Sequence, residues 1–237
     1  MDTLNLDNFK GVIFDLDGVI FDIIGCIKQA VEDAVEKYKI QTNIDDVLQE
    51  MAHLIEDLQH YPIPKIILNS YELLKDIQFL KGISFFKKFR VGVFLYNQFN
   101  KYKEDAGIFE GIDEIISKLH ERNLKLAILT NNKNTHAEEV LKKFNLDKYF
   151  ELIIGFNEVE EVKPSPEGIN LILKKWNINP SEAIFIGDMT TDILAGKAAK
   201  VKMICLASGL AVKEALMENE PDILLENTQE LKTLFNV

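Results

Sequence analysis

The stretch GVIFDLDGVIFD, residues 11–22, joins an apolar run to a pair of acids. The run at 12–14 is followed directly by Asp15, and Asp17 comes two residues later, just before Gly18. A short, continuous apolar run is typical of a strand buried on both faces, as in a parallel sheet. Two carboxylates this close repel each other, so the end of the predicted strand is a candidate site for a cation.

Five further apolar runs have the same character. They are KLAILT (125–130), FELIIG (150–155), AIFIGD (183–188), KMICLA (202–207) and DILLE (222–226). Helical patterns lie between them. Thr135 with Glu138 predicts a capping box that opens one helix, and Ser165-Pro166 predicts a cap followed by proline at the first helical position. This alternation predicts an α/β fold with a doubly wound, Rossmann-like parallel sheet and right-handed crossovers.

Residues 22–103 interrupt the alternation, because they contain helical spacing and no convincing strand. An aromatic-rich segment, ISFFKKFRVGVFLYNQF (83–99), closes this block, and we expect its phenylalanines to form a small core. The predicted architecture is therefore an α/β core domain, residues 1–21 and 104–237, with an inserted all-helical domain at 22–103.

Composition limits the classes of partner. The chain has 237 residues, with 27 Lys and Arg against 38 Asp and Glu and a net charge of −11. An acidic balance argues against a nucleic-acid partner, which requires a basic surface. We find neither a signal-peptide pattern nor a membrane-length apolar stretch, so we expect a cytoplasmic protein without a membrane partner, either monomer or homodimer. Cys26 and Cys205 lie in apolar contexts and are expected to be free. The four histidines are scattered and predict no histidine-based site.

The polar residues that end the predicted strands are the candidate site, because ligands of open α/β sheets bind beyond the carboxyl ends of strands. These residues, with a lysine before a predicted helix, are Asp15, Asp17, Thr130, Lys163, Asp188 and Asp192. Four carboxylates need more than one ammonium to remain ionised together. Mg²⁺, which prefers oxygen ligands, would supply the missing charge and leave one carboxylate to act as a nucleophile. Phosphoryl transfer suits such a site.

The motifs resemble, in order, those of the haloacid dehalogenase superfamily of aspartate-nucleophile hydrolases. They are DLDGV (15–19), Thr130 in ILTNN, Lys163 in VKPSPEG and GDMTTD (187–192). The resemblance implies that the α/β core carries the chemistry and that the insertion is the family's helical cap. It is strongest to the phosphoglycolate phosphatase and β-phosphoglucomutase-like members.

The resemblance also implies a role for each residue. Asp15 would attack phosphorus and form an aspartyl-phosphate, and Asp17 would protonate the leaving oxygen and later deprotonate water. Thr130 and Lys163 would hold phosphate oxygens. Backbone N–H groups would assist at Leu16, Asp17 and Asn131.

The same resemblance implies a magnesium ligand set. Asp15, the backbone carbonyl of Asp17, and Asp188 would bind Mg²⁺. Asp192 would be either a further ligand or, more in keeping with its place, an orienting residue outside the ligand shell.

Together these features predict a Mg²⁺-dependent phosphatase acting on a small phosphorylated metabolite, such as phosphoglycolate or a sugar phosphate. Asp17 favours phosphate esters over haloacids. A β-phosphoglucomutase-type mutase is the alternative, because Val19 is common among phosphosugar mutases, while Met189 departs from the usual small polar residue. A phospho-acceptor signalling domain and a catalytically silent binding protein are more distant alternatives. Candidate residues of the insertion for an anionic leaving group are Lys65, Lys87, Lys88 and Arg90.

Overall fold

A computed structural model describes residues 3–44, 46–48, 50–51, 80–209 and 211–237. The chain divides into two compact units. The first comprises Met1–Asp22, Gly107–Gly209 and Lys213–Val237, and the second comprises Ile23–Ala106 with Leu210–Val212. Residues 52–79 of the predicted helical insertion, Lys65 among them, lie outside the described residues.

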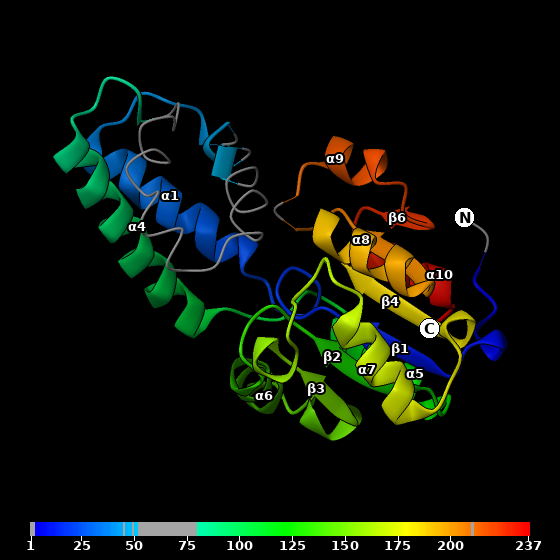
Figure 1. Ribbon diagram of the computed structural model, residues 1–237. Helices are drawn as coiled ribbons and strands as arrows, with labels where there is room; N and C mark the ends of the chain where they lie inside the picture. The colour runs from blue at the N-terminus through cyan, green and yellow to red at the C-terminus, as the bar shows by residue number, and fades with distance from the viewer. Residues whose placement is uncertain (1–2, 45, 49, 52–79, 210) are drawn as a thin grey trace. The chain divides into compact units, whose positions relative to one another are not determined.

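The first unit is built on a six-stranded sheet in which every pairing is parallel (Figure 1). The strand order is β3-β2-β1-β4-β5-β6. The strands are β1 (Gly11–Phe14), β2 (Lys125–Leu129), β3 (Leu152–Ile154), β4 (Ala183–Gly187), β5 (Lys202–Leu206) and β6 (Ile223–Leu225). All six apolar runs thus form strands, and the predicted doubly wound parallel sheet is confirmed.

Helices connect and cover these strands. They are α5 (Ile112–Glu121), α6 (Asn134–Lys143), α7 (Glu167–Trp176), α8 (Thr190–Ala199), α9 (Lys213–Glu218) and α10 (Thr228–Phe235). Short 3₁₀ turns occur at η1 (Leu6–Asn8), η3 (Asp147–Tyr149), η4 (Phe156–Glu158) and η5 (Pro180–Glu182). Helices α7 and α8 contact each other, with α7 packed against β2 and β3 and α8 against β4 and β5. The central strands of the sheet are therefore covered, and β1 and β4 are buried along their whole length.

The register of the sheet brings the ends of three strands level. Phe14, the last residue of β1, pairs with Ile128 of β2 on one side and with Ile186 of β4 on the other. Asp15 follows Phe14 directly, while Thr130 and Asp188 each come two residues after its partners. The polar residues that end β1, β2 and β4 consequently lie at one edge of the sheet.

Two predicted helix starts are wrong, the first by two residues and the second by one. Helix α6 begins at Asn134, so Thr135 lies inside the helix and does not cap it. The amide of Asn134 instead donates to Oδ1 of Asn157, at 3.2 Å, so a tertiary contact replaces the local cap. Helix α7 begins at Glu167, after Pro166, although Oγ of Ser165 still accepts from the Glu167 amide at 3.3 Å.

The chain leaves the first unit after Asp22 and returns at Gly107, and these two crossings are hydrogen-bonded to each other. The Asp22 amide donates to the Gly107 carbonyl at 3.1 Å, and the Phe109 amide donates to the Ile20 carbonyl at 3.0 Å. Phe21 and Ile108 form an antiparallel bridge between them. Entry to and exit from the second unit therefore share one place on the first.

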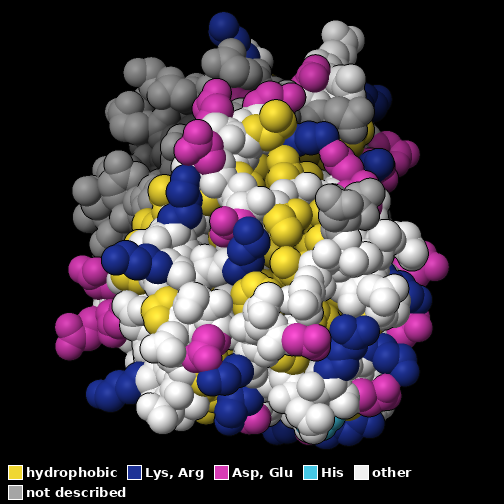
Figure 2. Space-filling model, turned by 90° about the vertical axis from the view of Figure 1, so that its right-hand side faces the viewer, with side chains coloured by type: hydrophobic (Ala, Val, Ile, Leu, Met, Phe, Trp, Pro, Cys, Tyr) yellow, Lys and Arg dark blue, Asp and Glu magenta, His cyan; other side chains and the backbone are white. Residues whose placement is uncertain are grey.

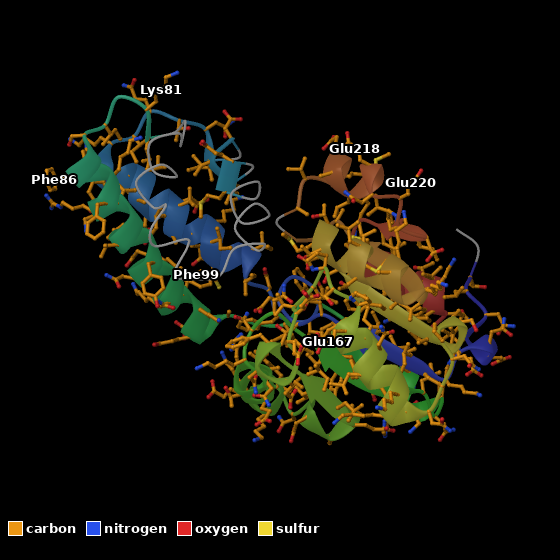
Figure 3. All side chains as sticks on the ribbon, in the orientation of Figure 1. Lys81, Phe86, Phe99, Glu167, Glu218 and Glu220 are labelled. Carbon is orange, nitrogen blue, oxygen red and sulfur yellow. The ribbon has the colours of Figure 1, made fainter. Side chains whose placement is uncertain are left out.

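Helices α1 (Ile24–Tyr38) and α4 (Phe85–Asp105) pack against each other in the second unit. Buried apolar residues of this unit form two clusters. One contains Ala34, Ile40, Leu80 and Val91, and the other contains Ile27, Val31 and Val47. The expectation that the phenylalanines form the core is only partly right. Phe94 and Phe99 pack against the clusters, whereas Phe86 is 81% exposed and projects away from α4 (Figure 3), and Phe89 is 57% exposed.

The surface carries charges of both signs. On the face drawn in Figure 2, acidic and basic side chains are interspersed, so the net charge of −11 is not gathered into one patch there. Among the described residues, no helix combines the length and apolar character needed to cross a membrane. Cys26 and Cys205 are both buried and free, as predicted.

Candidate active site

Asp15 extends β1 by one residue at the carboxyl edge of the sheet. Its amide donates to the Ile186 carbonyl at 2.8 Å, which fixes the backbone from which the side chain projects. Oδ1 of Asp15 lies 2.9 Å from Nζ of Lys163, and the same ammonium lies 2.7 Å from Oδ1 of Asp192 in the first turn of α8. All three side chains are buried. Because the surroundings exclude water, the Lys163 ammonium is the counter-charge on which both carboxylates depend.

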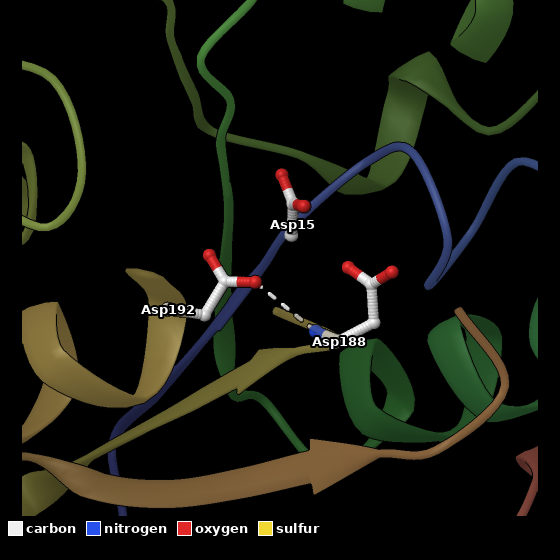
Figure 4. Close-up of side chains that lie close together, drawn as sticks. All are labelled: Asp15, Asp188 and Asp192. Carbon is white, nitrogen blue, oxygen red and sulfur yellow. Dashed lines mark hydrogen bonds between the residues drawn. The ribbon is translucent and has the colours of Figure 1, made fainter. Parts of the chain in front are cut away.

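Asp188, the first residue after β4, completes a cluster of three buried carboxylates. Asp15, Asp188 and Asp192 each offer an oxygen that lies within 4.8 Å of the other two, and Figure 4 shows the three side chains converging from separate elements. Oδ1 of Asp188 is buried and accepts no hydrogen bond from the part of the chain that the structure describes. A buried carboxylate oxygen without a donor is costly unless a cation is paired with it. The oxygen-only donor set therefore fits a hard divalent cation.

Asp192 has both of its oxygens engaged by the protein. Oδ2 accepts the backbone amides of Asp188 and Met189, both at 3.0 Å, and one of these bonds is dashed in Figure 4. Oδ1 faces Lys163. A carboxylate that caps the first turn of α8 holds the loop on which Asp188 sits. This geometry favours the orienting role for Asp192 over that of a direct metal ligand.

Burial and like charge shift the acid–base behaviour of the cluster. Burial raises the pKa of Asp15 to about 7, against the opposing attraction of Lys163 and with a further increase from Asp192. Burial, followed by repulsion from Asp15 and Asp192, raises the pKa of Asp188 well above its usual range. Burial opposes charge on Lys163, but the attraction of both neighbouring carboxylates outweighs it and raises the Lys163 pKa. The acids thus resist ionisation until a cation joins them.

Two glycines allow the backbone to approach the Asp188 carboxylate. Gly18 has a φ of +89°, in the left-handed region that favours glycine, and a Cβ there would lie 2.0 Å from Oδ2 of Asp188. A Cβ at Gly209 would lie 1.8 Å from the same oxygen. The Gly18 amide donates to the Phe21 carbonyl at 3.0 Å, which closes the tight turn after β1. The space beside Asp188 is therefore kept free of side chains from both loops.

Asp17 lies on that turn and is held from the side of β2 and α6. Its Oδ2 accepts a hydrogen bond from Nδ2 of Asn132 at 2.6 Å. Nε2 of His136, in the first turn of α6, lies 3.5 Å from Oδ1 of Asp17. The ring of Phe21 packs edge-on against the His136 ring, with 6.1 Å between centroids. The second acid is thus held by residues that follow β2, while burial and, to a lesser degree, its charge raise the pKa of Asp15 and of Asp188.

The end of β2 supplies the remaining predicted groups. Thr130 is buried, and its amide donates to the Ile154 carbonyl at 3.0 Å. The side chain of Asn131 makes two hydrogen bonds with the backbone of Lys163: Oδ1 accepts from the amide and Nδ2 donates to the carbonyl, both at 3.1 Å. This pair anchors the loop that carries the ammonium. Leu16 is buried at the start of the turn, where its carbonyl accepts from Ile20 at 2.9 Å.

A family comparison accounts for this arrangement. The model of the haloacid dehalogenase-like hydrolases matches residues 12–206, which is most of the chain and includes every residue of the cluster. The chain belongs to the haloacid dehalogenase-like hydrolase family. The resemblance found in the four motifs is thereby confirmed, and the chain is a hydrolase.

Within the family, the chain is similar to two groups of relatives. It is 26% identical to phosphoglycolate phosphatase of Salmonella paratyphi A over 242 residues, covering 95% of this chain and 92% of the relative. It is 36% identical to pyrophosphatase PpaX of Listeria welshimeri over 138 residues, covering 57% of this chain and 64% of that protein.

Solved structures of other proteins share the fold of this chain. A hydrolase from Pseudomonas syringae aligns with a TM-score of 0.63 at 21% identity, covering 96% of this chain and 98% of that one. A Thermotoga maritima protein to which β-phosphoglucomutase activity is attributed aligns with a TM-score of 0.67 at 22% identity, covering 97% and 100%. Each likeness extends over nearly the whole chain and is a likeness of fold.

Sequence reasoning missed two residues of this hydrolase's site, Asn132 and His136. Both contact Asp17, although the histidines had predicted no site. The available signal was only that both residues follow closely on Thr130, because Asn132 precedes α6, which begins at Asn134, and helical spacing does not relate the two side chains. The contact itself depends on β2 pairing beside β1.

Proposed function

We propose that the protein is a Mg²⁺-dependent phosphatase that hydrolyses a small phosphate monoester through an aspartyl-phosphate at Asp15. One observation carries this proposal: Lys163 bridges two buried carboxylates at a strand end, beside a third carboxylate with a buried oxygen that has no donor among the described residues. Such a site neutralises charge and positions groups, which is most of what phosphoryl transfer requires.

The residues would act in sequence. An oxygen of Asp15 attacks phosphorus while the bond from phosphorus to the ester oxygen breaks, and Asp17 gives its proton to the departing oxygen. Asp17 then takes a proton from water as that water attacks the aspartyl-phosphate, which releases inorganic phosphate and restores both acids. Lys163 and Thr130, with the amides of Leu16, Asp17 and Asn131, would hold the phosphate oxygens.

A divalent cation, when bound, would supply the charge that lets the carboxylates ionise together. The residues proposed to hold it are Asp15, Asp188 and the backbone carbonyl of Asp17, with Asp192 orienting the Asp188 loop. Mg²⁺ is the proposed ion because the donors are all oxygen atoms and phosphate is an oxygen donor as well.

The substrate proposed is a small phosphorylated metabolite, phosphoglycolate or a sugar phosphate, and the similarity to phosphoglycolate phosphatase over nearly the whole chain supports this choice. The test is a panel of phosphate monoesters, with pyrophosphate included because of the PpaX similarity, read as inorganic phosphate released with Mg²⁺ and with EDTA. Metal-dependent release from monoesters is expected. Absence of release from every compound would refute the proposal.

A mutase of the β-phosphoglucomutase type is the second candidate, favoured by Val19 and by the shared architecture with the Thermotoga maritima protein. It requires the same two acids but returns the phosphoryl group to a sugar. Isomerisation of a phosphosugar that depends on a bisphosphate primer, without net phosphate release, would establish the mutase instead.

We expect the cluster of buried carboxylates to lower the stability of the metal-free protein, and the variant Asp188→Asn tests this expectation. A raised carboxyl pKa means that stability is highest at low pH and is lost as the pH rises from the unfolded value through the folded one. At pH 8 in EDTA, removing the Asp188 charge should raise Tm by at least about 3 °C, roughly 1 kcal/mol for a chain of this size. The gain should shrink at pH 5, and the variant should lose most of the stabilisation by Mg²⁺ that the wild type shows.

Asp147→Asn, on the exposed turn η3, is the matched control and should leave Tm unchanged under all three conditions. A lower Tm for Asp188→Asn than for wild type at pH 8 in EDTA would contradict the account, because it would mean that the carboxylate stabilises the fold without a metal.

A further inference from the structure

The side chain of Asp17 projects from a loop, and an acid on a loop transfers protons efficiently only when one oxygen is held toward its partner. The Asp17 side chain is 15% exposed, so solvent alone does not orient it. The carboxylate accepts a hydrogen bond from Asn132, at 2.6 Å between Nδ2 and Oδ2. The orientation of Asp17 is therefore constrained on Oδ2 by a residue that lies 115 positions away in the sequence, while His136 lies 3.5 Å from Oδ1.

Asn132 is itself fixed through its backbone. Its amide donates to Oγ1 of Thr130 at 3.1 Å, and its carbonyl accepts from the Phe156 amide at 3.0 Å. Both backbone polar groups of Asn132 are thus hydrogen-bonded, although the residue as a whole is exposed. A substitution that removes only the side-chain amide keeps both backbone bonds.

The chemistry of an amide group makes this contact asymmetric. The NH₂ of asparagine donates hydrogen bonds and cannot accept one. The carbonyl oxygen of a neutral acid accepts a hydrogen bond more strongly than the hydroxyl oxygen does, so donation from Nδ2 of Asn132 to Oδ2 of Asp17 favours the proton on Oδ1. We propose that Asn132 is a positioning residue that orients the Asp17 carboxylate and confines its transferable proton to one oxygen. The inference rests on the proposed role of Asp17 as general acid and base.

The neighbouring asparagine provides an internal contrast. Asn131 bonds the backbone of Lys163, so its loss should disturb the ammonium and hence phosphate binding with every substrate. Loss of the side-chain amide of Asn132 should disturb only the steps in which a proton moves. The tandem asparagines after Thr130 would thus serve different catalytic side chains.

The experiment compares kcat/KM for an alkyl phosphate, whose leaving oxygen needs a proton, with 2,4-dinitrophenyl phosphate, whose leaving group departs without one. This constant reports the phosphorylation step. Asn132→Ala should lower it for the alkyl ester by about 10- to 100-fold, part of the usual contribution of a general acid, and leave the aryl ester within about twofold. Asn132→Asp, which has the same shape but opposes one carboxylate to another, should lower the alkyl value further.

Two controls separate this effect from a general one. Asn170→Ala, on the exposed face of α7, should change neither constant, whereas Asn131→Ala should lower both. In a double-mutant cycle, Asn132→Ala should have little further effect on the alkyl ester once Asp17→Asn is present, because its action passes through that acid.

Equal losses on both esters, no loss on either, or full additivity with Asp17→Asn would overturn the inference while leaving the phosphatase proposal standing. If the wild-type protein releases phosphate from neither ester, the proposed function is refuted, and the inference with it.

Discussion

Replacing Asp15 with asparagine should lower phosphate release by on the order of 10⁴-fold or more, the scale on which loss of a nucleophile usually acts. The amide keeps the shape of the side chain but is neither a nucleophile of this kind nor a counter-charge for Lys163, which lies 2.9 Å from the wild-type carboxylate. The measurement is inorganic phosphate released from an aryl phosphate with saturating Mg²⁺. Acid-quenched wild-type protein should in addition carry a phosphoryl group that the variant lacks.

Asp147→Asn serves as the matched control and should retain full activity, since it makes the same chemical change on an exposed turn. Unaltered phosphate release by Asp15→Asn would remove Asp15 from the role of nucleophile, and activity lost together with the fold would be detected by thermal unfolding.

Among the proposed substitutions, Lys163→Met should lower the free energy of unfolding the most, because it leaves Asp15 and Asp192 buried without their shared ammonium. Stripping one partner from a buried ion pair costs about 3–5 kcal/mol in the free energy of unfolding. Activity should fall by on the order of 10²- to 10³-fold through loss of a group that stabilises developing charge. Urea unfolding in EDTA measures the first effect, and phosphate release with Mg²⁺ measures the second.

The pH dependence of that loss has a definite sign. Lys163 lowers the pKa of Asp15, which is about 7 with the ammonium present, so removing the ammonium raises this pKa further. At pH 5.5, Asp15 of the variant is then neutral and does not repel Asp192. At pH 8, solution conditions favour the ionised carboxylate, which the folded state without the ammonium accommodates poorly. The stability deficit should therefore be smaller at pH 5.5 than at pH 8. Lys174→Met, on the exposed part of α7, should show no such deficit, and a pH-independent deficit in Lys163→Met would contradict the pairing.

The sheet could be predicted from the sequence because strands buried on both faces leave a continuous apolar run. Residues 12–14 and 183–187 are such runs, and each is followed by a polar residue where the strand emerges. The acids and the lysine of the cluster could be predicted for the same reason, since a parallel sheet places the ends of its strands at one edge.

The contacts of the second acid could not be predicted in this way. They join Asp17 to Asn132 and His136, and the choice of partner depends on side-chain geometry at the start of α6. That start was itself displaced by Asn157, a residue distant in the sequence from the predicted cap. Local patterns carry no information about such tertiary donors.

The aromatic segment shows a different limit. Helical spacing identifies a helix, and α4 forms over Phe85–Asp105, but spacing alone does not state which apolar residues turn inward. Phe99 packs against a buried cluster, while Phe86 and Phe89 are exposed on the same helix.

The hydrogen-bonded crossings at Asp22 and Gly107 hold the two ends of the inserted segment together. Closing a flexible loop costs entropy that grows only slowly with the number of residues in it, and here the ends of the inserted segment meet in a bridge between Phe21 and Ile108. A two-residue hairpin turn spans such a gap, so the first unit can be joined directly across it. We therefore expect segments of other lengths to be tolerated between the same two residues, with the strand end that carries Asp15 left as it is.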